Sequence, residues 1–118
     1  MPRQRIEPEP NFRLHIKRGI ALGPGKVALL ELITEHGSIS QAAKAMGMSY
    51  RTAWELVRSM NEHFVEPLVV NSKGGAKGGG AELTPLGKTV LRSYRAMEGR
   101  ALKAIAKDIA RLEALIRR

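Results

Sequence analysis

Four consecutive polar residues stand near the middle of the chain: Ser49, Tyr50, Arg51 and Thr52. An arginine guanidinium forms two parallel hydrogen bonds with O6 and N7 of guanine, and serine and threonine hydroxyls bond to bases or phosphates. A tyrosine side chain reaches a phosphate or packs on the methyl group of thymine. If these residues begin a helix, its free backbone N–H groups also point toward phosphate oxygens. Their types and spacing therefore predict the base-reading end of a helix that binds double-stranded DNA.

Six further polar residues are candidates for the same surface: Ser40, Gln41, Glu55, Arg58, Lys73 and Lys77. Gln41 either contacts a backbone phosphate or caps its own helix. Glu55 either accepts a hydrogen bond from cytosine N4 or pairs with Arg51 or Arg58. The two lysines stand among glycines that let the backbone approach DNA closely, so we expect them to contact phosphate or the minor groove. Trp54 is expected in core or boundary packing rather than in base contact.

Two short helices joined by a tight turn are predicted to position these residues. Ser38 begins a capping box for a helix over 39–46, and Gly47 ends that helix. Ser49 is the predicted N-cap of the next helix, which Pro67 prevents from continuing. The inward face of this second helix has apolar residues spaced by three and four: Ala53, Val57, Met60 and Phe64. This order is typical of a helix-turn-helix, whose second helix enters the major groove.

The segment before these helices contains three predicted elements. Residues 1–10 hold three prolines and charges of both signs, which predicts a disordered leader. Apolar and polar residues alternate over 12–17, as in a half-buried strand. A helix is expected over 25–36, with a buried stripe at positions 26, 29, 30 and 33, and Gly37 stands where a C-cap glycine belongs.

The segment after the two helices is predicted to be a β-hairpin. Strands are expected over 68–71 and 81–83, and the loop between them holds five of the twelve glycines of the chain. A hairpin in this position is the wing of a winged helix-turn-helix. We therefore expect one mainly α-helical DNA-binding domain with a small β wing over residues 11–84.

A long C-terminal helix is predicted over residues 85–118, with Thr84 as its N-cap and Pro85 in its first turn. Its apolar positions recur in steps of three and four over about thirty residues, more than a small domain covers, so we expect a homodimer built on this seam. The predicted interface residues are Leu86, Val90, Tyr94, Met97, Ala101, Ile105, Ile109, Leu112 and Ile116. Gly99 interrupts the helix and marks either a kink or a close approach of two helices.

Composition supports a polyanion partner and excludes several classes of function. The chain has 118 residues and a formal net charge of +9, and its sequence pI is about 10.5. With no cysteine, disulfides and thiolate zinc sites are excluded, and the composition fits the reducing cytoplasm. No apolar run is long enough for a membrane helix, and no secretory signal is visible.

An enzymatic function finds no support in the residue pattern. His15, His36 and His63 fall on three different predicted elements, without metal-ligand spacing. The Gly23-Pro24-Gly25-Lys26 run lacks the spacing and the Ser/Thr of a phosphate-binding loop. We therefore expect no catalysis, no metal site and no cofactor.

Three segments resemble the DNA-binding domain of molybdate-responsive transcriptional regulators of the ModE family, which is related to the LysR-type winged helix. They are Ser38-Ile39-Ser40-Gln41-Ala42-Ala43-Lys44, Met48-Ser49-Tyr50-Arg51-Thr52-Ala53-Trp54 and the glycine-rich run from Gly74 to Thr84. The resemblance implies a prokaryotic regulator that is dimeric through its terminal helices and binds a palindromic operator. Ser49, Tyr50, Arg51 and the two wing lysines match DNA-facing positions of the family.

Full-length members of that family carry C-terminal oxyanion-binding modules that sense molybdate. No such module follows the long helix here, so we expect no molybdate binding by this chain and either a separate sensor or constitutive action.

Three alternatives remain open at this stage. An architectural DNA-binding protein would use the nine lysines and arginines of residues 85–118 without reading sequence. A protein-interaction module would use its long helix and have no DNA affinity. A regulator with a small oxyanion effector would bind that effector at the basic helices. Sequence-specific regulation is the function that the pattern favours over all three.

Overall fold

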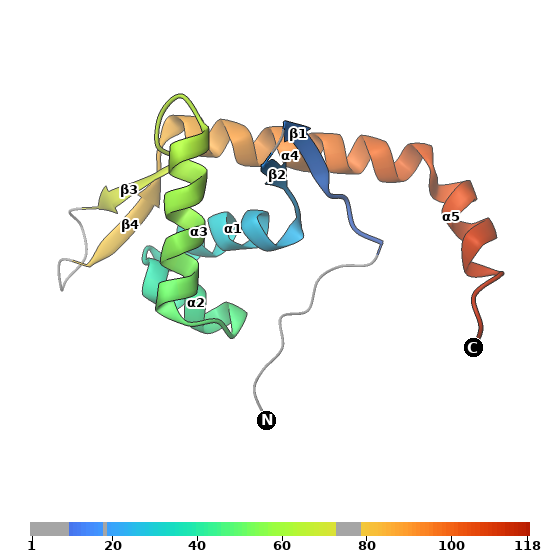
Figure 1. Cartoon of the computed structure of the whole chain (residues 1–118), viewed down its shortest axis with the longest axis horizontal. Helices are drawn as coiled ribbons and strands as arrows, with labels where there is room; N and C mark the ends of the chain where they lie inside the picture. Colours follow the sequence, from blue (N-terminus) through green and yellow to red (C-terminus); the bar gives the residue numbers. More distant parts are fainter. Residues whose placement is uncertain (1–9, 18, 73–78) are drawn as a thin grey trace.

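The computed structural model describes residues 10–17, 19–72 and 79–118. In Figure 1 the long helix α4 runs along one side of the molecule, and α3 crosses its wing-side end at a steep angle. The hairpin β3–β4 projects beyond that end of α4, and α5 turns away at the opposite end. The principal extents of 52 × 38 × 24 Å reflect this elongated arrangement.

Three helices form the predicted helix-turn-helix body: α1 (Pro24–His36), α2 (Ile39–Met46) and α3 (Tyr50–His63). Gly37 and Gly47 end the first two helices in the left-handed region, with φ of 71° at each. Glycine adopts this conformation without strain because it has no Cβ atom. The Ser38 and Ser49 side chains cap α2 and α3 by accepting the backbone N–H three residues on. The caps predicted from the sequence are therefore confirmed, and they set the turn between the two helices.

The core lies where these three helices meet the start of α4 and the two strands of the wing. Its largest fully buried side chains belong to α1, α3, α4 and the residue before β3: Tyr94, Leu29, Leu30, Ile33, Met60, Leu68 and Val27. The predicted stripe on α1 is confirmed at 29, 30 and 33, whereas Val27 rather than Lys26 is buried. Lys26 instead donates from Nζ to the carbonyl of Ala21 at 3.1 Å.

The wing consists of β3 (Val69–Ser72) and β4 (Gly80–Leu83), paired antiparallel from Val69 opposite Leu83 to Ser72 opposite Gly80. The Ala81 N–H also donates to the carbonyl of Gly37 at 2.8 Å. This bond holds β4 against the turn between α1 and α2, so the wing has a fixed place beside the helix-turn-helix.

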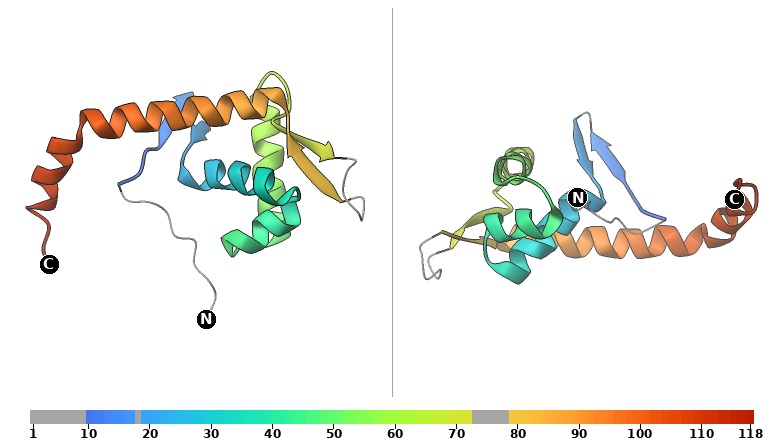
Figure 2. Two further views of the ribbon diagram at one scale, coloured as in Figure 1. Left: turned by 180° about the vertical axis from the view of Figure 1, so that it is seen from behind. Right: turned by 90° about the horizontal axis from the view of Figure 1, so that it is seen from below.

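A second hairpin precedes the helices, where only one strand was predicted. It pairs β1 (Leu14–Lys17) with β2 (Ile20–Leu22) and projects from the body near the middle of α4, as Figure 2 shows. Gly19 lies in the connection with a φ of 76°, a left-handed conformation that glycine adopts without strain. Three residues are too short for a periodicity signal, which is why β2 was missed. Ile16, expected on a half-buried face, is 48% exposed.

The single C-terminal helix predicted over 85–118 is wrong in one respect, because it is divided. α4 (Pro85–Ala104) ends at Ile105, and α5 (Ala106–Glu113) continues in a different direction (Figure 1). Gly99 lies inside α4 with open space where a Cβ atom would stand, so it marks neither the break nor a close approach within the chain. No helix in the described part of the chain has the length and apolarity that crossing a bilayer requires.

Candidate nucleic-acid interface

The first turn of α3 divides the four predicted base-reading residues into two pairs. The Ser49 Oγ accepts the Thr52 N–H at 3.1 Å and donates to the Thr52 Oγ1 at 3.0 Å. Both hydroxyls are therefore engaged in the helix cap while remaining exposed. An N-cap fixes the direction of the helix start, so this pair positions its neighbours.

Tyr50 and Arg51 are the pair that the fold leaves available. Tyr50 is 55% exposed and Arg51 is also exposed. Within the described residues, neither side chain makes a hydrogen bond or ion pair. An uncommitted guanidinium at the N-terminal end of a helix needs no internal bond to be broken before it contacts a base or phosphate.

Glu55 and Arg58 bind each other rather than standing free. The Arg58 Nε donates to the Glu55 Oε1 at 2.9 Å, and its Nη1 donates to the Glu62 Oε2 at 2.8 Å. The hydrogen bond to Glu55, with the charges of both carboxylates, raises the pKa of Arg58. The ion pair expected for Glu55 is thus formed, and it offsets the positive charge of Arg58 in the protein without DNA.

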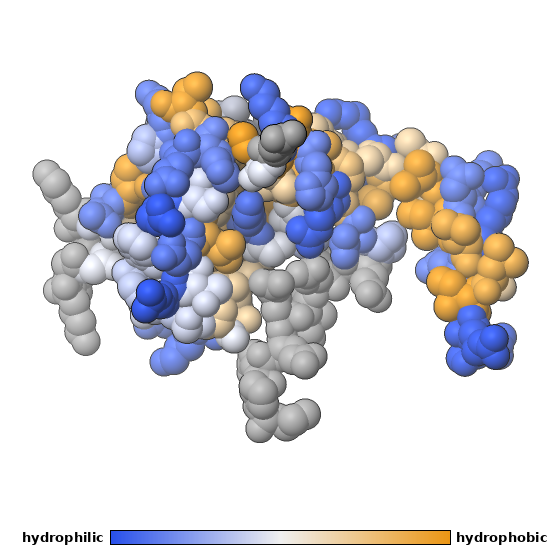
Figure 3. Space-filling view, viewed as in Figure 1, coloured by the Kyte–Doolittle hydropathy of each residue, from blue (hydrophilic) through white to orange (hydrophobic). Residues whose placement is uncertain are grey.

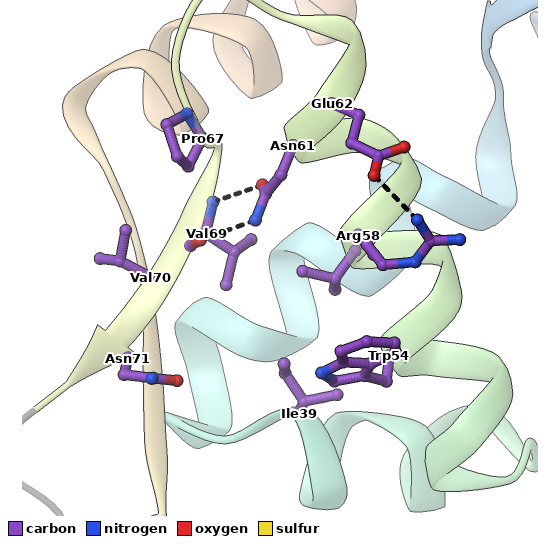
Figure 4. Close-up of a pocket in the computed structure, with 10 residues that line it drawn as sticks. Ile39, Trp54, Arg58, Asn61, Glu62, Pro67, Val69, Val70 and Asn71 are labelled. Carbon is purple, nitrogen blue, oxygen red and sulfur yellow. Dashed lines mark hydrogen bonds and ion pairs between the residues drawn. The ribbon is translucent and has the colours of Figure 1, made fainter.

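A surface groove of about 480 Å³ separates the middle of α3 from the wing strand β3 (Figure 4). Trp54 and Ile39 form one side of the groove, and Val70 lies across it on β3. Trp54 is 43% exposed, and the Arg58 guanidinium lies 6.0 Å from its ring centroid. The tryptophan is therefore not a core residue: it is exposed beside the groove, and whether it packs there or contacts a base stays a prediction.

The remaining candidates fall on α2 and on the wing loop. Ser40 and Gln41 are exposed in the first turn of α2. The Gln41 N–H donates to the Ser38 Oγ at 2.9 Å, while its side chain makes no bond back to Ser38 among the described contacts. Lys73 and Lys77 lie outside the described residues. The described strands of the wing pair as far as Ser72 opposite Gly80.

One residue that sequence reasoning missed links α3 to the wing. The Asn61 Oδ1 accepts the N–H groups of Leu68 and Val69 at 2.8 and 3.2 Å, and its Nδ2 donates to the Val69 carbonyl at 3.0 Å (Figure 4). A polar residue beside the apolar stripe of a helix resembles an ordinary surface residue in sequence. Its spacing of seven from Leu68 gives no periodic signal.

The predicted dimer residues separate into two groups. Val90 and Tyr94 are buried inside this chain, at 9% and 0% exposure, and the Tyr94 hydroxyl donates to the Phe12 carbonyl. Both therefore belong to the core rather than to a surface for a partner, which corrects their assignment. Leu86 packs partly against the same core.

The C-terminal members of the series face solvent. Ile105 is 45% exposed, Leu112 63% and Ile116 68%, and no residue of α5 is buried. Met97, Ala101 and Ile109 are partly buried. Figure 3 shows apolar side chains gathered over α5. This exposed apolar face of α5 is what remains of the predicted seam.

The sequence matches a known family over most of this architecture. Residues 25–88 fit the family described as "Bacterial regulatory helix-turn-helix protein, lysR family". The chain belongs to this family. The matched residues begin in α1, include α2, α3 and the wing, and end in the first turn of α4.

Several characterised proteins are similar to the chain over the same region. The molybdenum transport protein ModE of Azotobacter vinelandii is 45% identical over 80 residues, which cover 68% of this chain and 30% of the relative. The transcriptional regulator ModE of Yersinia pestis is 35% identical over 114 residues, covering 94% and 43%. The DNA-binding transcriptional dual regulator ModE of Escherichia coli K12 is 38% identical over 89 residues, covering 75% and 34%. The predicted ModE resemblance is confirmed, and the chain spans less than half the length of these relatives.

Two solved structures share the fold. The crystal structure of the CbnR_DBD–DNA complex matches with a TM-score of 0.56 and 21% identity, covering 76% of this chain and 95% of that one. Full-length LysG of Corynebacterium glutamicum matches with a TM-score of 0.55 and 22% identity, covering 75% and 29%. The winged helix-turn-helix predicted from the sequence is thereby confirmed as the fold.

Proposed function

We propose that this protein is a sequence-specific, double-stranded-DNA-binding transcriptional regulator that acts as a homodimer in the bacterial cytoplasm. The observation that carries the proposal is the exposed, uncommitted Tyr50–Arg51 pair on the first turn of a capped α3. Family membership and the ModE relatives support the same assignment. The formal net charge of +9 favours a polyanionic partner.

The division of roles follows from the placement of each side chain. Arg51 reads a base edge in the major groove and Tyr50 contacts a phosphate or a thymine methyl group. Ser49 and Thr52 hold the helix start in register. Ser40 and Gln41, in the first turn of α2, contact the backbone beside that groove.

Glu55 and Arg58 have a conditional role in this proposal. They form an ion pair with each other in the protein without DNA, at 2.9 Å. Both are about half exposed, so exchanging this pair for a base or phosphate contact costs little. The wing lysines, Lys73 and Lys77, contact phosphate or the minor groove and position the domain without reading sequence.

The second copy of the chain packs on the exposed apolar face of α5 and the adjoining part of α4. The residues that carry this contact are Met97, Ala101, Ile105, Ile109, Leu112 and Ile116. Exposed apolar side chains on a short helix with no buried residue favour burial against a partner. A two-fold dimer then requires an inverted-repeat operator, because each recognition helix reads one half-site.

The test is selection of bound fragments from random-sequence duplex DNA at roughly physiological salt, with the full chain and no effector. We expect enrichment of an inverted repeat whose half-sites lie about one helical turn apart. Binding without any enriched sequence would overturn sequence specificity and favour an architectural protein. The absence of binding, with and without added molybdate, would overturn DNA binding by this chain.

A further inference from the structure

The end of α3 is attached to the wing by a single side chain. Asn61, in the last turn of α3, forms three hydrogen bonds with the backbone of Leu68 and Val69, all between 2.8 and 3.2 Å. Its amide oxygen accepts two of them and its amide nitrogen donates the third. Leu68 is fully buried and Val69 is nearly so. This attachment therefore fixes the position of residues 68–69 relative to α3.

The same backbone segment also holds the beginning of α4. The Thr84 N–H donates to the Leu68 carbonyl at 2.9 Å, and the Thr84 hydroxyl donates to the Pro67 carbonyl at 2.7 Å. That hydroxyl also accepts the Gly87 N–H at 3.0 Å, as the N-cap of α4. Every hydrogen-bonding group of the cap is thus engaged at the point where β3 begins.

Gly87 permits the closest approach at this point. A Cβ atom on Gly87 would overlap the carbonyl oxygen of Leu68, so a residue with a side chain cannot occupy this position without moving α4 away from the strand. Gly87 is itself buried in the first turn of α4. Its backbone is ordinary helix, so close packing explains this glycine and its conformation does not.

These contacts form one continuous link from the recognition helix to the helix that leads to the second copy. We call Asn61, Leu68, Val69, Thr84 and Gly87 the α3–α4 junction. A second link ties α4 to α1 farther along, where the Arg95 Nε donates to the Glu31 Oε2 at 2.9 Å. That ion pair is partly exposed, so it makes a weak restraint. The junction therefore joins the end of α3 to the start of α4, whereas Val90 and Tyr94 hold α4 against the core farther along.

We propose that Asn61 and Gly87 are positioning residues that set which half-site spacing the dimer selects. This inference rests on the proposed function, since spacing has meaning only for a dimer that reads two half-sites. In such a dimer, α4 and α5 join the copies while α3 reads DNA. The junction converts the geometry of the dimer into the distance and rotation between the two recognition helices.

The geometry of DNA makes spacing a sensitive readout of this angle. Each inserted base pair moves one half-site by about 3.4 Å and rotates it by about 34° around the DNA axis. If the junction is rigid, the two α3 helices cannot move to match the displaced half-site, so affinity falls when base pairs are inserted. If the junction is loosened, the helices can match the new position in part. If the junction is displaced, the dimer binds best at a different spacing.

The experiment measures affinity for a series of duplexes that hold the selected inverted repeat with zero, one, two or five inserted base pairs, together with a duplex that holds a single half-site. The variants are Asn61→Ala, which removes all three side-chain bonds, and Gly87→Ala, which forces α4 outward. His63→Ala is the matched control, because His63 is an exposed residue of the same helical turn outside the junction.

For the wild type and His63→Ala, we expect one or two inserted base pairs to weaken binding at least about tenfold. For Asn61→Ala, that loss should fall below about threefold while single half-site affinity changes by less than about threefold. For Gly87→Ala, the preferred spacing should shift by at least one base pair. A purely structural role would lower paired and single half-site binding equally and leave the spacing profile unchanged.

An unchanged spacing profile in both folded variants would overturn the proposal. Circular dichroism establishes that each variant is folded. If one of the two variants is not folded, Asn61→Asp takes its place. The aspartate side chain can still accept the N–H groups of Leu68 and Val69 but cannot donate to the Val69 carbonyl. An unaltered spacing profile for Asn61→Asp would also overturn the proposal. If the wild type itself does not distinguish paired from single half-sites, then the dimeric function fails before the junction is in question.

Discussion

α4 and α5 carry one apolar repeat but use it in opposite ways. In α4, Val90 and Tyr94 lie in the core of the chain, and Gly87 packs against the backbone of Leu68, just before β3. In α5, no residue is buried; Leu112 is mostly exposed, as is Ile116 just beyond the end of the helix. Apolar residues at the same spacing of three and four are therefore buried in α4, where they stabilise the single chain. In α5 they are left exposed. An amphipathic period reports that a face is covered, not which molecule covers it.

The same contrast appears between the two ends of α3. At its N-terminal end, Tyr50 and Arg51 are exposed and make no side-chain bond within the described residues. At its C-terminal end, the Asn61 side chain forms three hydrogen bonds to the wing backbone. Side chains that bond within the chain contribute to its stability. Exposed side chains without such bonds are available to bind a partner.

The largest expected effect concerns the buried end of this contrast. Tyr94→Ala should lower the free energy of unfolding by about 3–5 kcal/mol, because it empties a fully buried site in the core. Urea denaturation followed by circular dichroism measures this change. Tyr94→Phe keeps the tilted ring contact with Phe12, whose centroid is 5.6 Å away, and should lose far less. A loss of less than about 1 kcal/mol for Tyr94→Ala, the size expected of a surface change, would contradict the core assignment.

The next effect concerns the exposed end. Leu112→Asp should leave helical content and unfolding of the single chain nearly unchanged and weaken self-association by about 100-fold, since it places a charge in the apolar contact. Sedimentation equilibrium over a range of concentrations measures the association.

Ala110→Asp is the matched control for that variant. It introduces the same charge on the same helix, but Ala110 lies off the apolar stripe of α5. Equal dissociation by both variants would show that charge alone is responsible, and an unaltered dimer in Leu112→Asp would place the interface elsewhere.

A smaller effect is expected where α3 meets DNA. Arg51→Ala should cost about 1–3 kcal/mol of binding free energy and relax the base preference at one position of each half-site. The stability of the protein should not change, because Arg51 is exposed. Competition binding with single-base variants of the operator measures the preference. If affinity and preference both stay at wild-type values, α3 does not read bases through this residue.

The smallest effect is expected from the wing. Lys77→Ala should weaken binding to all sequences about equally and reduce the slope of log affinity against log salt concentration by roughly one. Titrations at several salt concentrations measure the slope on specific and unrelated DNA. A change in base preference instead would mean that the wing reads sequence.

Much of the fold and part of the site followed from local sequence. The caps at Ser38, Ser49 and Thr84 were predicted correctly because each hydroxyl acts on an N–H only three residues away. The C-cap glycines at 37 and 47 were identified for the same reason. The polar start of α3 was recognisable because its residues are adjacent in the chain.

What the sequence by itself determined was therefore the order of the first three helices and the wing, the capped helix ends and the polar start of α3, since these depend on contacts within a few residues. The tertiary structure decided which apolar positions are interior, because burial depends on elements as distant as Phe12 and Tyr94. It also decided the division of the last helix at Ile105 and the role of Asn61. These features depend on contacts between segments that are distant in the sequence. The spacing of residues within one segment does not predict such contacts.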